Sequence, residues 1–241
     1  MRTVEVCFTP ELIGKYDIEN KMVVVIDILR ATTIITTMFK NGLYKLIPVK
    51  NLDEAKEYKE KGFLVAAERN GMKVDFADFN NSPYIFTKEN IKGKTLVYSS
   101  TNGTNTINDA KIARQVVIAS FLNLTAVANY IKKINFDVVL LCSGWQGNFC
   151  SEDAIFAGAL SEKLLTTKHL TTNCDSLLAS IDLWSLAKQD ILTYIKTIYQ
   201  YQRLSRLGLG DIIDYCFQID ITGEIPVLKD DYLVEQKNFK K

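Results

Sequence analysis

The stretch MVVVIDILRATT, residues 22–33, decides how the rest of the chain is interpreted. Five apolar residues in a row, from Met22 to Ile26, are typical of a strand buried on both faces of a parallel sheet. The residues that follow Arg30 have the spacing of an amphipathic helix. Asp27 and Arg30 therefore lie at the carboxyl end of the strand, where open α/β sheets bind ligands and the next helix presents free N–H groups to an anion. This position predicts a phosphate site, with one alternative, in which Asp27 caps the helix and pairs with Arg30.

Predicted strands and helices alternate on both sides of this stretch. Such alternation indicates a single α/β domain over residues 1–241, of the three-layer α/β/α type with a mainly parallel sheet. It leaves open two lobes, about 1–120 and 121–241, around a shared cleft. The segment from Pro226 onwards is predicted to be an extended or edge segment with a flexible end. The pattern predicts strands at residues 3–8, 22–26, 43–49, 63–67, 94–98, 115–119 and 137–142, and helices at 31–40, 53–61, from about 105, 125–133, 154–165, 174–189, 190–207 and 211–217.

The composition is that of an ordinary globular protein, with 47% hydrophobic and 24% charged residues among 241. The 29 basic and 28 acidic residues nearly cancel, which gives no reason to expect nucleic acid or an anionic membrane as a partner. No apolar stretch approaches the ~20 residues of a membrane span, and the N-terminus lacks the pattern of a signal peptide. We therefore expect a cytoplasmic protein that acts on a small molecule, and the sequence leaves a homo-oligomer open.

The cysteines and the histidine of this chain do not indicate a disulfide, metal-binding or catalytic role. The five cysteines are widely spread and form no CxxC pair, so they predict neither a disulfide framework nor a zinc site and are expected in the core. The single histidine, His169, lies in a polar, threonine-rich segment and is expected at the surface. The sequence therefore argues against catalysis by histidine.

Charged side chains follow two further predicted strands. Glu68 and Arg69 come directly after one of them, and Glu152 and Asp153 come after another, at the start of a helix. A long polar loop with Asp78 follows the first pair, and irregular loops of this length are usually functional or mobile. Because ligands bind at the carboxyl ends of parallel strands, we expect these acids to gather at one site. Glu152 and Asp153 would also suit the first turn of any helix.

The segment SSTNGT, residues 99–104, links another predicted strand to a helix. Its small hydroxyl and amide side chains around Gly103 could cradle phosphate oxygens. The segment is not a Walker A motif, because the GxxxxGK[ST] spacing is absent. A helix cap and turn without a ligand explains it equally well.

Seven segments, in this order, resemble the 2-phosphosulfolactate phosphatase (ComB) family. They are VVVIDILRATTII (23–35), AAERNG (66–71), DFNNSP (78–83), GKTLVYSSTNGT (93–104), SFLNLTAVA (120–128), CSGWQGNFCSEDAIFAG (142–158) and RLGLGDIIDYC (206–216). The resemblance covers nearly the whole chain. It implies a magnesium-dependent acid phosphatase on an α/β fold, which hydrolyses 2-phospho-3-sulfolactate to sulfolactate in coenzyme M biosynthesis.

The chain departs from the family pattern in two places. Residues 76–83 read FADFNNSP where the family usually has GFDLGNSP, and the loss of two glycines restricts the backbone of this loop. Ser143 stands where the family's CAG has alanine. The acids within the matching motifs are all present, so the sequence supports the hydrolase chemistry more firmly than the substrate.

Magnesium prefers carboxylate and water oxygens and bridges to phosphate, which suits a group of acids without histidine. The predicted metal ligands are Asp27, Glu68, Asp78, Glu152 and Asp153, and the predicted catalytic acids are Asp27, Glu68 and Asp153. The predicted phosphate or sulfonate binders are Arg30, Arg69, Thr32, Thr33, Asn102, Gly103 and Thr104. Whether water attacks directly or Asp27 forms a phospho-aspartate stays open.

Three other functions compete with this one. A haloacid-dehalogenase-like phosphatase also starts from an Asp after a buried strand, but its DxDx[TV] signature would need an acid where this chain has Leu29. A phosphatase of another small phosphorylated hydroxy acid would need only a few changed pocket contacts. A non-catalytic anion-binding module is disfavoured because acids at the strand ends would repel an anion unless a metal intervened.

Overall fold

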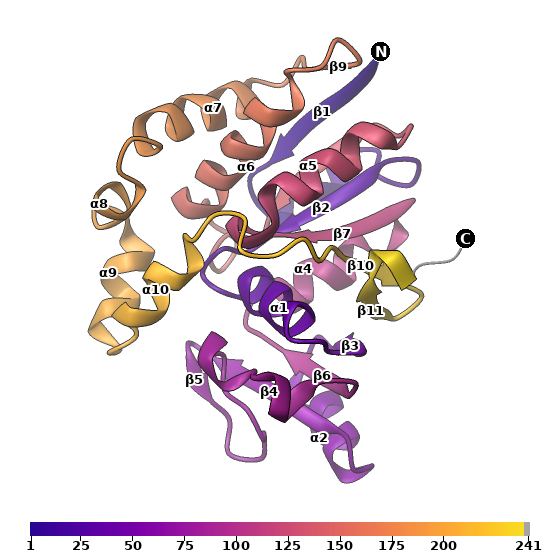
Figure 1. Cartoon of the computed structure of the whole chain (residues 1–241), viewed down its shortest axis with the longest axis vertical. Helices are drawn as coiled ribbons and strands as arrows, with labels where there is room; N and C mark the ends of the chain where they lie inside the picture. The colour runs from indigo at the N-terminus through magenta and orange to yellow at the C-terminus, as the bar shows by residue number, and fades with distance from the viewer. Residues whose placement is uncertain (239–241) are drawn as a thin grey trace.

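The computed structural model describes residues 1–238, and it shows one mixed sheet with helices on both faces (Figure 1). This arrangement confirms the predicted three-layer α/β/α class. The strands of the described chain are β1 Arg2–Cys7, β2 Met22–Ile26, β3 Lys45–Pro48, β4 Leu64–Arg69, β5 Met72–Lys73, β6 Thr95–Ser99, β7 Gln115–Ala119, β8 Val138–Cys142, β9 Leu170–Thr171, β10 Pro226–Lys229 and β11 Tyr232–Glu235. Their order in the sheet is β5-β4-β6-β3-β11-β10-β7-β2-β8-β1-β9.

Most helices connect successive strands, and α7 to α10 follow one another between β9 and β10. The α-helices are α1 Ala31–Lys40, α2 Leu52–Glu60, α3 Lys88–Ile91, α4 Gly103–Asp109, α5 Leu124–Lys133, α6 Ser151–Leu164, α7 Asp175–Ala187, α8 Ile191–Ile195, α9 Tyr199–Arg206 and α10 Gly210–Cys216. Short 3₁₀ helices are η1 Pro10–Lys15, η2 Pro83–Ile85, η3 Ala110–Ile112, η4 Phe121–Asn123 and η5 Gln236–Asn238.

Strand β2 is buried on both of its faces, as its apolar run predicts. Met22, Val24 and Ile26 pack into a cluster that includes residues of α5, α6 and α7. Val23 and Val25 point the other way and pack into a second cluster with residues of α1 and α4. Alternate side chains of one strand therefore hold the two helical layers on opposite sides of the sheet.

Two groups of parallel strands make up most of the sheet. One group holds β7, β2, β8, β1 and β9, and the other holds β3, β6 and β4. The hairpin β10–β11 lies between them and pairs antiparallel with β7 on one side and β3 on the other. Because three successive antiparallel pairings separate β7 from β3, the second group runs opposite to the first. Strands in sheets are rotated by roughly 20–25° relative to their neighbours, so we expect the two groups also to be strongly rotated relative to one another.

One prediction about the second half of the chain is wrong, and another is confirmed in part. The segment 190–207 is not one helix. Asp190 caps α8, whose end is closed by Thr197 Oγ1 donating to the carbonyl of Tyr194, and α9 begins after the extended Ile198. The segment after Pro226 is extended, as predicted, but it does not lie at an edge, because it forms the hairpin in the middle of the sheet. The predicted flexible end, residues 239–241, lies outside the described residues.

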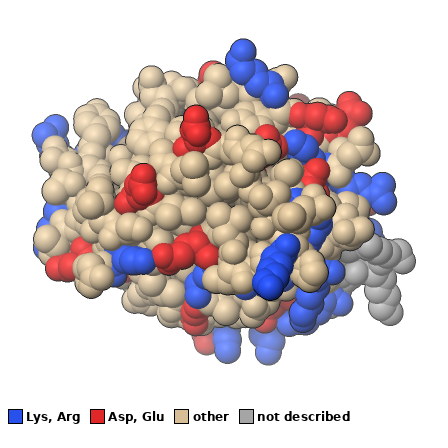
Figure 2. Space-filling view, turned by 90° about the horizontal axis from the view of Figure 1, so that it is seen from above, with Lys and Arg blue, Asp and Glu red and all other residues tan. Residues whose placement is uncertain are grey.

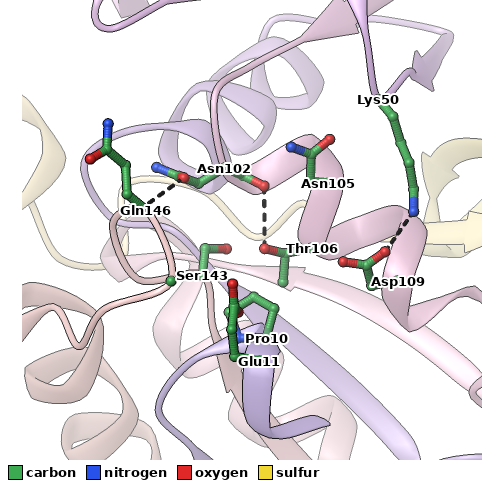
Figure 3. Close-up of a pocket in the computed structure, with 10 residues that line it drawn as sticks. Pro10, Glu11, Lys50, Asn102, Asn105, Thr106, Asp109, Ser143 and Gln146 are labelled. Atoms are coloured by element: carbon green, nitrogen blue, oxygen red, sulfur yellow. Dashed lines mark hydrogen bonds and ion pairs between the residues drawn. The ribbon is translucent and has the colours of Figure 1, made fainter. Parts of the chain in front are cut away.

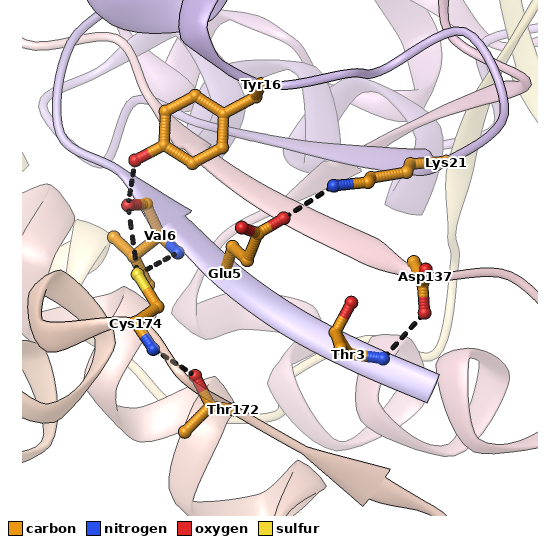
Figure 4. Close-up of polar contacts among 8 residues, drawn as sticks. All are labelled: Thr3, Glu5, Val6, Tyr16, Lys21, Asp137, Thr172 and Cys174. Carbon is orange, nitrogen blue, oxygen red and sulfur yellow. Dashed lines mark hydrogen bonds and ion pairs between the residues drawn. The ribbon is translucent and has the colours of Figure 1, made fainter. Parts of the chain in front are cut away.

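Strand β1 is fixed in place by polar contacts as well as by its ladder (Figure 4). The backbone N–H of Thr3 donates to Asp137 at 2.6 Å, just before β8. Lys21 donates to Glu5 at 2.6 Å, just before β2. Both contacts lie near the starts of these strands, so they fix the register at the edge opposite the predicted site.

The cysteines lie mostly in the core and His169 lies at the surface, as predicted. All five cysteines are free, four are buried and Cys174 is half-buried. His169 is exposed. On the face shown in Figure 2, basic and acidic side chains are interspersed and much of the surface carries neither. Within residues 1–238, no helix has the length and apolarity needed to cross a membrane.

Candidate active site

A small polar pocket lies where the carboxyl ends of β2, β4 and β6 meet the first turns of α1 and α4. It is lined by Asp27, Leu29, Arg30, Ala31, Glu68, Gly71, Asn81, Ser100, Thr101, Asn102, Trp145 and Arg203. Its cavity measures about 20 Å³, which is room for about one water molecule. The pocket is therefore closed to a phosphate ester, which enters only when part of its wall moves.

Asp27 directly follows β2 and is almost completely buried. Its Oδ1 accepts from the backbone N–H of Ala31 at 3.0 Å, and its own N–H donates to Thr32 Oγ1 at 3.0 Å. Burial, and to a smaller degree the charge of Glu68, raises the pKa of Asp27 to about 6. Asp27 thus caps α1, as the structural alternative predicts, and also presents a carboxyl with a near-neutral pKa to the pocket.

Gly103, the first residue of α4, lies directly against this carboxyl group. A Cβ added to Gly103 would lie 2.4 Å from the Cβ of Ala31 and 2.7 Å from Asp27 Oδ2. Real atoms do not approach so closely, so a larger residue would force α4 away from α1. Glycine is required here for space, and it allows the helices after β2 and β6 to meet although their strands belong to different groups.

Glu68 connects two segments of the pocket wall through hydrogen bonds. Its Oε1 accepts from the N–H of Thr101 at 2.7 Å and from the Thr101 hydroxyl at 3.0 Å, and its Oε2 accepts from the N–H of Gly71 at 2.7 Å. These bonds tie the end of β4 to the loop after β6. Glu68 is therefore a buried carboxylate whose position is fixed by three hydrogen bonds.

Two arginines reach the pocket from different parts of the chain. Arg30 is buried, and its Nη2 donates to the carbonyl of Gly71 at 3.3 Å. Arg203 comes from α9, lies 3.9 Å from the ring centre of Trp145, and donates through Nε to Gln200 at 2.7 Å. Burial, and then the charge of Arg30, lowers the pKa of Arg203. Two guanidinium groups that repel one another in a buried pocket favour the binding of an anion.

Glu152 and Asp153 begin α6 behind the pocket. Asp153 accepts from the N–H of Ile28 at 2.9 Å and from that of Gly144 at 3.1 Å, so it joins the loops after β2 and β8. Burial raises the pKa of Glu152 to about 7 and that of Asp153 well above its usual range, with Glu152 and Asp27 adding to the latter shift. Neither side chain lines the pocket.

Asp78 is not brought to this site. Its carboxylate accepts from Lys59 at 2.5 Å and from the N–H of Val65 at 2.8 Å, at the start of β4. Glu68 lies near the other end of the same strand. The loop after β5 folds back along β4, and this turns Asp78 away from the carboxyl end that the sequence predicts for it.

Arg69 does not line the pocket either. It donates to Ser99 Oγ at 2.9 Å and to the carbonyl of Glu68 at 2.6 Å, and it also contacts the carbonyl of Lys50. Its guanidinium group is thus occupied by protein acceptors. It links the ends of β4 and β6, and the second pocket arginine is Arg203.

The predicted hydroxyl donors are also used within the protein. Thr32 Oγ1 donates to the carbonyl of Asp27 at 2.9 Å and Thr33 Oγ1 to that of Ile28 at 3.0 Å. Thr104 Oγ1 donates to the carbonyl of Ser100 at 3.2 Å. Among the predicted anion binders, Arg30 and Asn102 line the pocket, and Gly103 shapes it.

Arg203, Trp145 and Asn81 line the pocket but are not among the residues predicted from the sequence. Arg203 lies three residues after the buried Gln200, on the same face of α9, and the sequence alone does not show that this face reaches the pocket. The helix lies more than 170 residues from Asp27, so no local pattern connects them. Trp145 lies within the motif at residues 142–158, but this motif does not indicate that Trp145 stacks on Arg203.

The acids of the site fit a sparse magnesium site. Within residues 1–238, no group of three or more acidic, histidine or cysteine side chains is arranged as a metal cage. Magnesium is usually bound through one or two carboxylates, with water and phosphate oxygens completing its shell. Asp27 and Glu68 are the two carboxylates that line the pocket. They therefore match a magnesium site in which the protein supplies one or two carboxylates and water and phosphate supply the other oxygens.

Buried carboxylates facing two arginines, at the ends of strands in an α/β sheet, define a protein with a site for a small anion. The family model described as 2-phosphosulpholactate phosphatase matches residues 7–231 of the chain. The chain belongs to this family, and the family's activity is that of a phosphoric monoester hydrolase. The resemblance seen in the seven sequence segments is thereby confirmed.

Similar proteins match almost end to end. A protein of Caldanaerobacter subterraneus subsp. tengcongensis is 36% identical over 231 residues, which cover 94% of this chain and 95% of that protein. One of Carboxydothermus hydrogenoformans is 38% identical over 226 residues, covering 92% of each chain. One of Clostridium novyi is 36% identical over 212 residues, covering 87% and 89%. Each is named a probable 2-phosphosulfolactate phosphatase.

Proposed function

We propose that the protein hydrolyses the phosphate ester of 2-phospho-3-sulfolactate to sulfolactate and phosphate, with magnesium as its cofactor. The observation that carries the proposal is that Arg30 and Arg203 line one closed pocket together with two buried carboxylates, Asp27 and Glu68. The family and the names of the relatives support the substrate. The proposal extends to a cytoplasmic location and, through sulfolactate, to a step of coenzyme M biosynthesis.

The two arginines match the charge of such a substrate. 2-Phosphosulfolactate carries a phosphate, a sulfonate and a carboxylate, and its binding needs several positive groups in a buried site. A guanidinium group can hold a tetrahedral oxyanion through two parallel hydrogen bonds. Arg30 is fixed by burial, whereas Arg203 comes from a helix at the rim and can close over the ligand.

Asp27 is the candidate catalytic carboxylate. In the proposed reaction a water oxygen bonds to phosphorus, the ester P–O bond breaks, and the leaving oxygen takes up a proton. Asp27 lines the pocket together with Arg30, and its carboxylate would accept the proton of the attacking water. When bound by Asp27 and Glu68, magnesium would neutralise charge on the phosphoryl oxygens. Glu68 also keeps the loop after β6 in position through its hydrogen bonds to Thr101.

The test measures phosphate release from 2-phosphosulfolactate, 2-phospholactate and p-nitrophenyl phosphate, each with magnesium and with EDTA. We expect magnesium-dependent turnover that favours the sulfonated substrate. Turnover of only the other esters would reject the substrate and keep the phosphatase. No release from any ester would favour the anion-binding module.

Two variants on one helix test the site itself. Arg203→Ala removes a charged hydrogen-bond donor, so kcat/KM should fall about 10- to 150-fold. Arg206→Ala is the matched control, because Arg206 lies on the same helix but is exposed, and it should change kcat/KM less than about twofold. Equal effects of the two substitutions would remove Arg203 from the site.

A further inference from the structure

A second, much larger cavity adjoins the closed pocket (Figure 3). It measures about 610 Å³, and Asn102 lines both cavities. It opens between α4, the start of η1 and the loop after β8. A ligand whose phosphate lies in the closed pocket could therefore extend into it past Asn102.

Ser143, directly after β8, provides an unsatisfied polar group on the wall of this cavity. The residue is 2% exposed, and its hydroxyl has no hydrogen-bond partner among the described residues. Figure 3 shows the side chain pointing toward Thr106, on the opposite wall. Among the described residues, the buried hydroxyls of Ser161 and Thr167 also lack a partner, but Ser143 is the one of the three that lines this cavity, where a ligand could supply the missing hydrogen bond.

The charges of the cavity exclude a further anionic group. Its lysine, Lys50, is paired with Asp109 at 2.6 Å, and the other charged side chain on its wall, Glu11, is an acid. A sulfonate or carboxylate placed here would meet net negative charge. The anionic groups of a substrate must therefore bind in the arginine pocket.

The remaining polar side chains suit neutral hydroxyl groups. Asn105 and Gln146 join Asn102 and Thr106 on the wall. Amide side chains both donate and accept hydrogen bonds, and so do the hydroxyl groups of a polyol. This complementarity extends along the cavity from the edge of the arginine pocket to Ser143.

We propose that this cavity is a second subsite that binds the neutral, polyhydroxylated part of a larger phosphate ester, with Ser143 as a specificity-determining residue. The inference rests on the proposed phosphatase activity and extends its substrate class to polyol phosphates. The reaction is the same: water bonds to phosphorus, the ester P–O bond breaks, and the polyol leaves with a proton on its oxygen.

The experiment compares sorbitol 6-phosphate with 2-phospholactate, which lacks the polyol chain. We expect hydrolysis of both, and we expect Ser143→Ala to lower the ratio of their kcat/KM values about five- to tenfold, the effect of one neutral hydrogen bond. Ser161→Ala is the matched control, since it also deletes a buried, unpartnered hydroxyl but does not line the cavity. It should leave the ratio unchanged. Asn105→Ala provides a second test on the opposite wall.

Binding separates this inference from the proposed function. Calorimetry with sorbitol 6-phosphate on the Asp27→Asn protein measures the subsite without turnover. A protein that hydrolyses 2-phosphosulfolactate but neither binds nor hydrolyses sorbitol 6-phosphate would overturn the subsite alone. So would an unchanged ratio in both Ser143→Ala and Asn105→Ala. Binding of sorbitol 6-phosphate that Ser143→Ala weakens, without hydrolysis of any ester, would support the subsite and reject the phosphatase.

Discussion

Replacing Gly103 by alanine tests whether the position of Asp27 determines activity. The new Cβ would lie 2.4 Å from the Cβ of Ala31 and 2.7 Å from Asp27 Oδ2. Two carbon atoms in ordinary contact are about 3.5–4.0 Å apart, so α4 and α1 must separate by more than about 1 Å. Because Ala31 also donates its N–H to Asp27, that movement carries the carboxylate with it.

The expected loss follows from this displacement. A catalytic group misplaced by about 1 Å costs on the order of 100-fold in rate, so kcat/KM of Gly103→Ala should fall by about that factor. Overpacking also costs about 1–3 kcal/mol of stability. At roughly 2–4 °C per kcal/mol for a chain of this size, Tm should fall by about 2–12 °C.

The assay combines phosphate release with thermal unfolding of the same preparations. Gly223→Ala is the matched control, because a Cβ there meets no atom within 4 Å, and both its kcat/KM and its Tm should stay close to wild type. A Gly103→Ala protein that melts normally and retains wild-type kcat/KM would refute the reasoning. A lower Tm with full activity would show that the helices separate but that Asp27 takes no part in the reaction.

Two further predictions concern the charge and the closure of the pocket. Because the pKa of Asp27 is raised to about 6, the folded state binds more protons than the unfolded state between about pH 4 and 6, and stability falls as pH rises through this window. In EDTA, Asp27→Asn should therefore be more stable than wild type by up to about 3 kcal/mol at pH 8 and lose this advantage near pH 4, as thermal melts at both values would reveal. A substrate can enter the 20 Å³ pocket only if a wall moves. The variant Trp184→Phe leaves Trp145 as the single tryptophan. Binding of 2-phosphosulfolactate to this variant should therefore change the fluorescence of Trp145. An unchanged spectrum at saturating ligand would place the opening elsewhere than at the Arg203–Trp145 stack.

The elements around Asp27 could be predicted from the sequence to the residue. The apolar run of β2 has no polar interruption, and the helix after it has a clear period, so the predicted bounds of β2 and α1 agree with the structure. The hairpin β10–β11 could not be placed in the same way. Pro226 and the charged residues after it favour an edge, whereas Val227 and Leu233 are fully buried between the two groups of strands. Strand pairing at such a sequence distance leaves no local signal.

In the candidate site, too, the contacts between residues near in sequence could be predicted, and those between residues far apart could not. Short polar side chains next to a helix start can reach their own backbone, and Thr32, Thr33 and Thr104 all do so. Their sequence pattern therefore predicts bonds to the backbone as well as it predicts a phosphate cradle, and in this fold the hydroxyls bond to the backbone. The additional positive charge of the pocket comes instead from Arg203, whose long side chain reaches the site from a remote helix. A residue that binds an anion must keep donors free of its own backbone, and a guanidinium group, with its five N–H donors, can make one protein contact and still hold a ligand.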